Sequence, residues 1–223
     1  MQAEEKARLW MKCHRGILRQ SIHRARRHAD WKRVCHALLD PFFPVSYLLR
    51  NMVILERETP WKRLTHRGKV QAMHSLLRER ALFFLQVKTW LKTSGGYKTI
   101  VDFSPPFAGR GTPSYCTHCG GCCETASGFP DFPSHSIIPQ RWKEIFSSGL
   151  GKGHRFCPFL WEYRKTGMSL CAIHPWRANP CRVFGEDDCT FVLQDPDLAH
   201  VTHEKHIGKA FKTLIQGIKA SPF

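Results

Sequence analysis

The run "CTHCGGCC" constrains the fold of this 223-residue chain more than any other feature. A C-x2-C turn lets two thiolates approach one ion, so the repeated step from Cys116 to Cys122 can direct three thiolates at a single centre. The two glycines inside the run suit backbone that wraps around sulfur, which often requires a positive φ. The run contains four cysteines: Cys116, Cys119, Cys122 and Cys123.

Six other cysteines are spread unevenly. Cys13 and Cys35 precede the run and are expected to be buried, as free cysteine often is, while Cys157, Cys171, Cys181 and Cys189 follow it. Eight thiols could complete two four-cysteine zinc sites, two clusters, or one cluster with structural cysteines left over. Cys123 directly follows Cys122, so it would serve a second centre or the core. Lasting disulfides are uncommon in a reducing compartment, which favours metal or redox chemistry.

Three other cysteine chemistries fit the spacing poorly. A c-type haem requires C-x-x-C-H, and no histidine directly follows Cys119 or Cys122. A Rieske centre requires two boxes that each supply cysteine and histidine, and the chain has no second box. A thioredoxin-like pair could be formed by Cys119 and Cys122, but no strand and helix pattern surrounds them.

Positive charge is concentrated in the first half of the chain. Residues 1–100 carry 21 lysines and arginines against 7 acidic residues, whereas residues 101–223 carry 13 against 11. Such a surface would attract an acidic protein, a nucleic acid or an anionic membrane surface, although no recognised nucleic-acid-binding module is present. The plainer interpretation is that these side chains line the solvent side of amphipathic helices.

The basic half has the periodicity of helices, which predicts a mainly α fold. Apolar residues at three- and four-residue steps predict a helix with one apolar stripe, and Thr59-Pro60 upstream suits a helix start. A second helix is predicted from about Glu4 to Leu39, ended by Pro41 and Pro44. The apolar stripe of the predicted helix that follows Thr59-Pro60 consists of Val70, Met73, Leu77, Ala81, Phe84, Val87 and Leu91.

Glycine and proline divide the chain into three expected parts. Residues 1–95 form the basic helical region, and residues 96–114 form a linker rich in both residue types. Residues 115–223 form a small irregular cysteine-cluster domain held together by bound metal, with a closing amphipathic helix from Leu198 to Ile218.

We expect a cytoplasmic protein without a transmembrane segment. The first residues lack the basic start and apolar run of a secretory signal. No stretch approaches the ~18 apolar residues of a membrane span. The longest apolar stretch, Val45 to Leu55, is interrupted by Arg50 and Asn51.

The order of the cysteines resembles that of the YkgJ-like cysteine-cluster family, a zinc- or iron-chelating C-x2-C-x2-C-C domain. The resemblance covers residues 115–190 and rests on "CTHCGGCC", "CPFL", "CRVF" and the cysteines between and after them. It implies a small domain held together by metal, with an iron–sulfur cluster, and it extends to the cysteine-rich part of flagellin lysine N-methylases. The chain departs at His174, where the family usually has tyrosine, and at Ala178, where it usually has proline.

The resemblance also implies roles for single residues. Arg177 and Arg182 match the family's arginines, and donors beside the sulfurs would stabilise a negatively charged thiolate centre and raise the potential of a cluster. His174 is an available imidazole, but a site rich in sulfur does not need it. The metal ligands implied by the resemblance are Cys116, Cys119, Cys122, Cys123, Cys157, Cys171, Cys181 and Cys189.

Three functions from different classes stay open, and no catalytic residue can be named. The leading one is binding of an iron–sulfur cluster, of the 4Fe–4S type by the tandem spacing, with zinc as the alternative because both metals accept four thiolates. The second is a protein-modifying enzyme such as a flagellin-methylase-like methyltransferase, for which the sequence offers no glycine-rich nucleotide loop. The third is an adaptor with a structural zinc site and a basic partner-binding surface.

Overall fold

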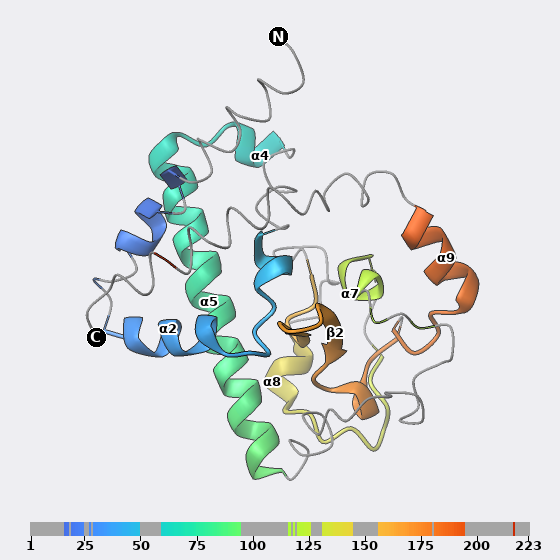
Figure 1. Cartoon of the computed structure of the whole chain (residues 1–223). Helices are drawn as coiled ribbons and strands as arrows, with labels where there is room; N and C mark the ends of the chain where they lie inside the picture. The colour runs from blue at the N-terminus through green and yellow to red at the C-terminus, as the bar shows by residue number, and fades with distance from the viewer. Residues whose placement is uncertain are drawn as a thin grey trace. The chain divides into compact units, whose positions relative to one another are not determined.

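The computed structural model describes residues 16–17, 19–24, 27, 29–49, 59–94, 116, 118, 120–125, 131–144, 156–179, 181–194 and 216. In these ranges the fold is mainly α-helical, with one two-stranded sheet, which agrees with the mainly α part of the expected fold class (Figure 1). The elements are α2 (Trp31–Leu39), α4 (Thr59–Lys62), α5 (His66–Thr93), α7 (Gly121–Thr125), α8 (Gln140–Lys143), β1 (Leu160–Tyr163), β2 (Met168–Cys171), η2 (His174–Trp176) and α9 (Glu186–Gln194).

Helix α5 follows the apolar periodicity of the sequence. The predicted stripe is buried along its whole length, from Val70 at 7% exposure to Leu91 at 0%. The helix begins later than expected, because Thr59 starts the separate helix α4 and residues 63–65 lie between the two helices. The side-chain oxygen of Thr65 accepts the backbone N–H of Gly68 at 3.2 Å, which satisfies one donor at the helix start.

The continuous helix predicted from Glu4 to Leu39 is wrong in its middle. Residues 19–24 are helical, but residues 27, 29 and 30 are in turns, and α2 begins at Trp31. Helix α2 ends at Leu39, because the next residue precedes Pro41 and adopts an extended conformation with ψ of 135°. Cys35 is fully buried in α2, as expected. Cys13 and the rest of the first fifteen residues lie outside the described ranges.

The chain divides into two compact units, Met1–Phe83 with His200–Phe223, and Phe84–Ala199. The division falls inside α5. The predicted boundaries at residues 95 and 115 border on residues that are not described, and they stay a prediction. The linker also lies outside the described residues, as does the closing helix apart from the helical Gln216. No helix in the described ranges is long and apolar enough to cross a membrane.

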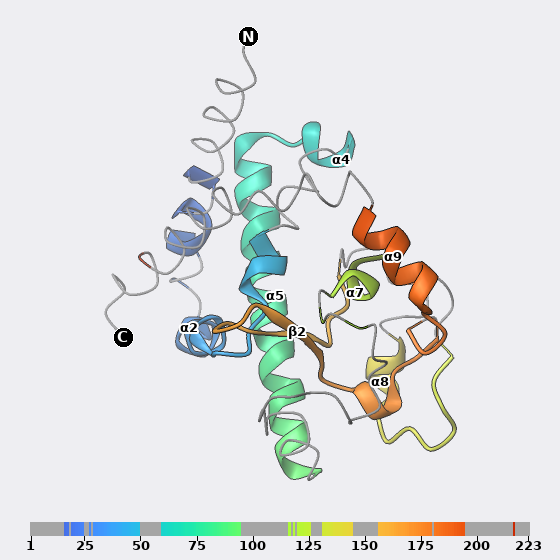
Figure 2. The ribbon, with the colours of Figure 1, turned by 45° about the vertical axis from the view of Figure 1, so that its right-hand side comes forward.

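The hairpin of β1 and β2 lies in the second unit and was missed by the sequence analysis (Figure 2). Its strands are antiparallel, with Leu160 opposite Cys171 and Tyr163 opposite Met168. In the connecting turn, Gly167 has a φ of 73° and donates its N–H to the Tyr163 carbonyl at 2.8 Å. Three consecutive residues of β1 are buried, so the strand lacks the alternation that would have predicted it.

Aromatic rings form much of the core of the second unit. Phe84, near the middle of α5, lies 5.0 Å from Trp161 of β1 between ring centroids. Trp90, later on α5, makes edge-on contacts with Trp142 of α8 at 5.3 Å and with Trp176 of η2 at 5.6 Å. These contacts attach α8 and η2 to the last part of α5, and η2 precedes the loop that carries Cys181.

Replacing Phe84 by alanine should lower the free energy of unfolding by about 3–5 kcal/mol, because the ring is buried against Trp161 and its loss leaves a cavity. Guanidinium unfolding followed by circular dichroism measures the change. Phe191→Ala is the matched control, since that ring is 73% exposed and its loss should cost less than about 0.5 kcal/mol. Equal costs for the two substitutions would contradict the described core.

Candidate metal centre

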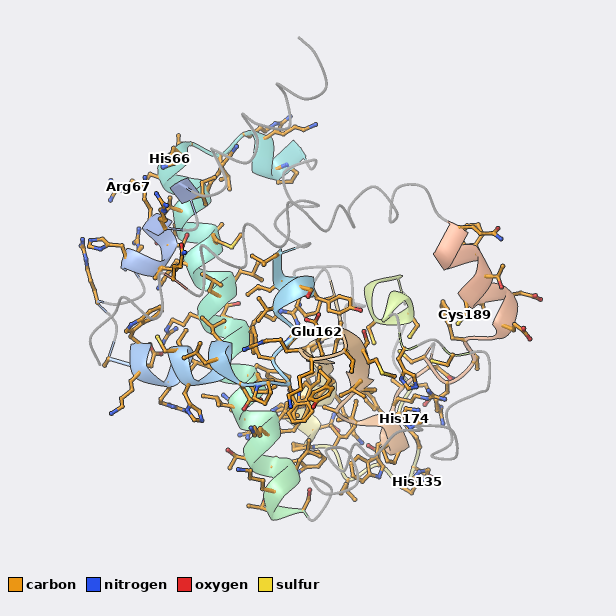
Figure 3. The ribbon with its side chains drawn as sticks, in the orientation of Figure 1. His66, Arg67, His135, Glu162, His174 and Cys189 are labelled. Atoms are coloured by element: carbon orange, nitrogen blue, oxygen red, sulfur yellow. The ribbon has the colours of Figure 1, made fainter. Side chains whose placement is uncertain are left out.

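Seven of the eight cysteines predicted as ligands belong to the described residues, and Cys119 does not. Cys122 and Cys123 lie on α7, Cys171 ends β2, and Cys189 lies on α9, where Figure 3 labels it. No disulfide joins the described cysteines.

Backbone hydrogen bonds hold the cysteine run against the segment that follows it. The N–H of Cys157 donates to the carbonyl of Cys123 at 2.7 Å, and the N–H of Ser169 on β2 donates to the carbonyl of His118 at 2.8 Å. His118 and Gly120 have positive φ values of 56° and 78°, which turn the chain sharply before α7. The run is thereby fixed to both the start and the second strand of the hairpin region.

Helix α9 lies against α7 in the same unit (Figures 1 and 2). The first turn of α9 contains three acidic residues, and Asp188 accepts the N–H of Gly185 at 2.8 Å, which satisfies a donor at the helix start. Cys189 follows within this first turn. The packing of α9 on α7 thus carries Cys189 toward the helix that holds two of the predicted ligands.

The neighbouring thiols of Cys122 and Cys123 affect each other's ionisation. A hydrogen bond from Cys123 lowers the pKa of the Cys122 thiol, and the positive charge of Arg177 acts in the same direction, although burial opposes both. The same hydrogen bond, together with burial, raises the pKa of Cys123 well above its ordinary value. Cys122 is therefore the thiol that ionises first of the pair.

Cys171 and Cys181 lie close enough to Cys122 for its charge to raise their pKa. Burial first, and then Cys181, raise the pKa of Cys171 to about 12. Burial first, and then Cys122, raise the pKa of Cys181 to about 11. Cys157 and Cys171 in turn raise the pKa of Cys123. Five thiols from four separate segments of the sequence thus lie in one small region.

Arg177 lies among these thiols and also contacts His174. Its charge acts to lower the pKa of Cys122, Cys171 and Cys181, but burial outweighs it at Cys171 and Cys181, whose pKa is raised. Its Nη1 lies 3.0 Å from Nε2 of His174, and because a guanidinium can only donate, Nε2 must accept. Burial, Arg177 and His118 lower the pKa of His174 to about 4, so this imidazole is neutral at pH 7 with one lone pair engaged by Arg177.

Arg182 has a different partner. Its Nη2 forms an exposed ion pair with Asp131 Oδ2 at 3.2 Å and also donates to the Asp131 carbonyl. The N–H of Asn179 donates to the same carbonyl at 3.0 Å. Asp131 thus ties down the segment around Cys181, a role that sequence reasoning missed because its partners lie 48 and 51 residues away. The predicted contact of Arg182 with sulfur stays a prediction.

The donor set consists mainly of thiols, which suits zinc and iron–sulfur clusters. Within the described ranges, no group of three or more Cys, His, Asp or Glu side chains has the arrangement of a metal site. Cys119, the middle thiol of the C-x2-C-x2-C spacing, is outside those ranges. In the described part of the chain, several thiols therefore lie in the same region, but they do not form a complete set of metal ligands.

In metal-free, reduced protein, Cys122 should react with iodoacetamide faster than Cys171 or Cys181. Thiolate is the reactive form, and a lowered pKa supplies it at lower pH. At pH 8 a thiol with a pKa of about 12 is ionised in only roughly one molecule in ten thousand. Mass spectrometry of the labelled peptides over a pH series measures the rates.

Cys123→Ala provides the control, because it removes the hydrogen bond that most strongly lowers the pKa of Cys122. The onset of labelling at Cys122 should then move to higher pH. Labelling of Cys171 as early as Cys122 in the unsubstituted protein would contradict the described thiol neighbourhood.

Comparisons of the chain with protein-family models, with curated proteins and with solved structures found no match. The resemblance to the YkgJ-like family therefore stays a prediction that rests on the order of the cysteines. The description of the site above depends on the residues of this chain alone.

Proposed function

We propose that the region from Cys116 to Cys189 binds a metal centre through cysteine thiolates, with an iron–sulfur cluster as the first choice and zinc as the second. One observation carries the proposal: five thiols, from α7, the segment before β1, the end of β2 and the loop after η2, perturb one another's pKa. Without metal, Cys123, Cys171 and Cys181 keep their protons at neutral pH, because burial and the neighbouring thiols raise their pKa. A bound cation would instead stabilise them as thiolates.

The spacing of the first three cysteines favours iron over zinc. A C-x2-C-x2-C run supplies three corners of one cubane in ferredoxins, here Cys116, Cys119 and Cys122. Ligand type alone does not separate the metals, because both accept four thiolates. Bound there, an iron–sulfur cluster would supply one-electron transfer, and zinc would supply a cross-link without redox chemistry.

Two residues of this chain have further roles in the proposal. Arg177 would stabilise the negative charge of a thiolate centre, since its charge already favours ionisation of three cysteines. His174 would hold the Arg177 guanidinium in place through its accepting Nε2 rather than bind metal with that atom. Cys123, paired with Cys122, is the candidate for a second centre or a fourth corner.

Protein purified without oxygen should be brown and should contain iron and acid-labile sulfide in similar amounts, because a cluster brings both. Elemental analysis and visible absorbance measure this. Colourless protein with stoichiometric zinc would show that the bound metal is zinc instead of iron, and the predicted ligands would stay the same. Protein that contains neither metal after purification, and takes up neither on reconstitution, would contradict the proposal.

Cys116→Ser, Cys122→Ser and Cys181→Ser should each lose most of the metal, because a hydroxyl is a far weaker ligand than a thiolate and a small metal domain depends on its site for folding. Cys35→Ser is the matched control, since Cys35 is fully buried in α2 of the first unit. Metal content per chain and thermal unfolding are measured for each variant. Loss of metal from Cys35→Ser as well would show that metal retention depends on the whole fold rather than on the cluster of thiols.

A further inference from the structure

The first unit contains an open pocket of about 550 Å³ that the metal centre does not involve. Its wall is formed by the helical segment of residues 19–24 with the turn after it, and by the start of α5. Figure 3 labels His66 and Arg67 at that helix start. The polar side chains that line the pocket are Gln20, His23, Arg24, Arg27, His66 and Arg67.

Hydrogen bonds across the pocket hold its two walls together. The hydroxyl of Ser21, which is fully buried, lies 3.1 Å from the carbonyl of Val70 and 2.7 Å from that of Ile17. Nε2 of His66 donates to Oε1 of Gln20 at 3.0 Å. Gln20, His23 and Arg24 are three and four residues apart, so they lie along one side of the helical residues 19–24. Arg27, in the turn that follows, contacts His23 of the same segment. The pocket is therefore built before any ligand arrives.

The charge of this pocket is one-sided. Three arginines line it, and none of its described lining residues is acidic. Arg67 lies in the first turn of α5, which has no acidic residue, although a cation near a helix N-terminus is unfavourable. Arg27 donates to Nε2 of His23 at 3.3 Å. Within the described ranges, no hydrogen bond or ion pair to another residue engages the side chain of Arg24 or Arg67.

We infer that this pocket binds a compact anion that carries two or three adjacent phosphate groups, either inorganic polyphosphate or the phosphate tail of a nucleotide. Arginine favours phosphate because its planar fork can bind two oxygens at once. The volume is that of a small-molecule site, whereas a nucleic acid strand needs an extended basic stripe. Because several guanidinium groups surround one opening, a ligand with several adjacent negative charges fits the pocket better than a ligand with a single charge.

Isothermal titration calorimetry of the full-length protein with inorganic tripolyphosphate tests the inference. Arg24→Gln/Arg67→Gln should weaken binding at least about tenfold, because two charge-assisted contacts are removed. Arg19→Gln/Arg33→Gln removes the same charge from exposed sites outside the pocket and should change affinity less than about threefold. Circular dichroism of both variants checks that each is folded.

Equal weakening by the two double substitutions would overturn the inference, since only the overall charge would then matter. Failure of the unsubstituted protein to bind tripolyphosphate at low millimolar concentration would overturn it too. A single-stranded oligonucleotide that binds and is not displaced by tripolyphosphate would assign the basic surface to nucleic acid instead, and would also overturn it.

Titrations with ATP and AMP identify the source of the phosphates. Equal affinity for ATP and tripolyphosphate, with much weaker binding of AMP, would assign recognition to the phosphate groups alone. Tighter binding of ATP would add a nucleoside contact to the same site. Both results support a polyphosphate site, and AMP binding as tightly as ATP would overturn it.

Discussion

The second unit depends on the hydrogen bond from the Cys157 N–H to the Cys123 carbonyl, at 2.7 Å. The two residues lie 34 positions apart, and the contact fixes the cysteine run at the entrance to the hairpin. The bond from Ser169 to the His118 carbonyl adds a second attachment on β2. Backbone bonds between such distant segments carry no side-chain signature, yet they decide which thiols become neighbours. Without them, the C-x2-C-x2-C spacing alone would bring together only local cysteines.

The sequence predicted the structure best for a helix that buries a single apolar stripe, as α5 does. The predicted stripe of α5 is buried from Val70 to Leu91, because a 3.6-residue period is visible in the sequence without knowledge of any partner. The start of that helix was harder to predict, because both Thr59 and Thr65 are suitable residues for a helix start. Which of them begins α5 depends on the break in the helix at residues 63–65. The turns at residues 27, 29 and 30 likewise interrupt a segment whose composition favours continuous helix.

The candidate site was predictable in its residue types but not in its contacts. The order of the cysteines indicated the candidate ligands, and Arg177 was named because it matches an arginine of the family that this order resembles. Asp131 could not, because its contacts with Asn179 and Arg182 depend on how two distant loops fold. The hairpin was also hidden, since three buried residues in a row give β1 no alternation. The pocket at the start of α5 was visible only as excess charge, because its walls come from segments about 40 residues apart.

The edge-on contacts of Trp90 with Trp142 and Trp176 have a spectroscopic consequence. Indole rings whose centroids lie 5.3 Å and 5.6 Å apart in fixed, non-parallel orientations couple their electronic transitions and become optically active together. Trp176 ends the short helix that begins at His174, so the orientation of its ring is tied to the loop leading to Cys181. Near-ultraviolet circular dichroism therefore gives this chain an intrinsic, label-free readout of order in that loop.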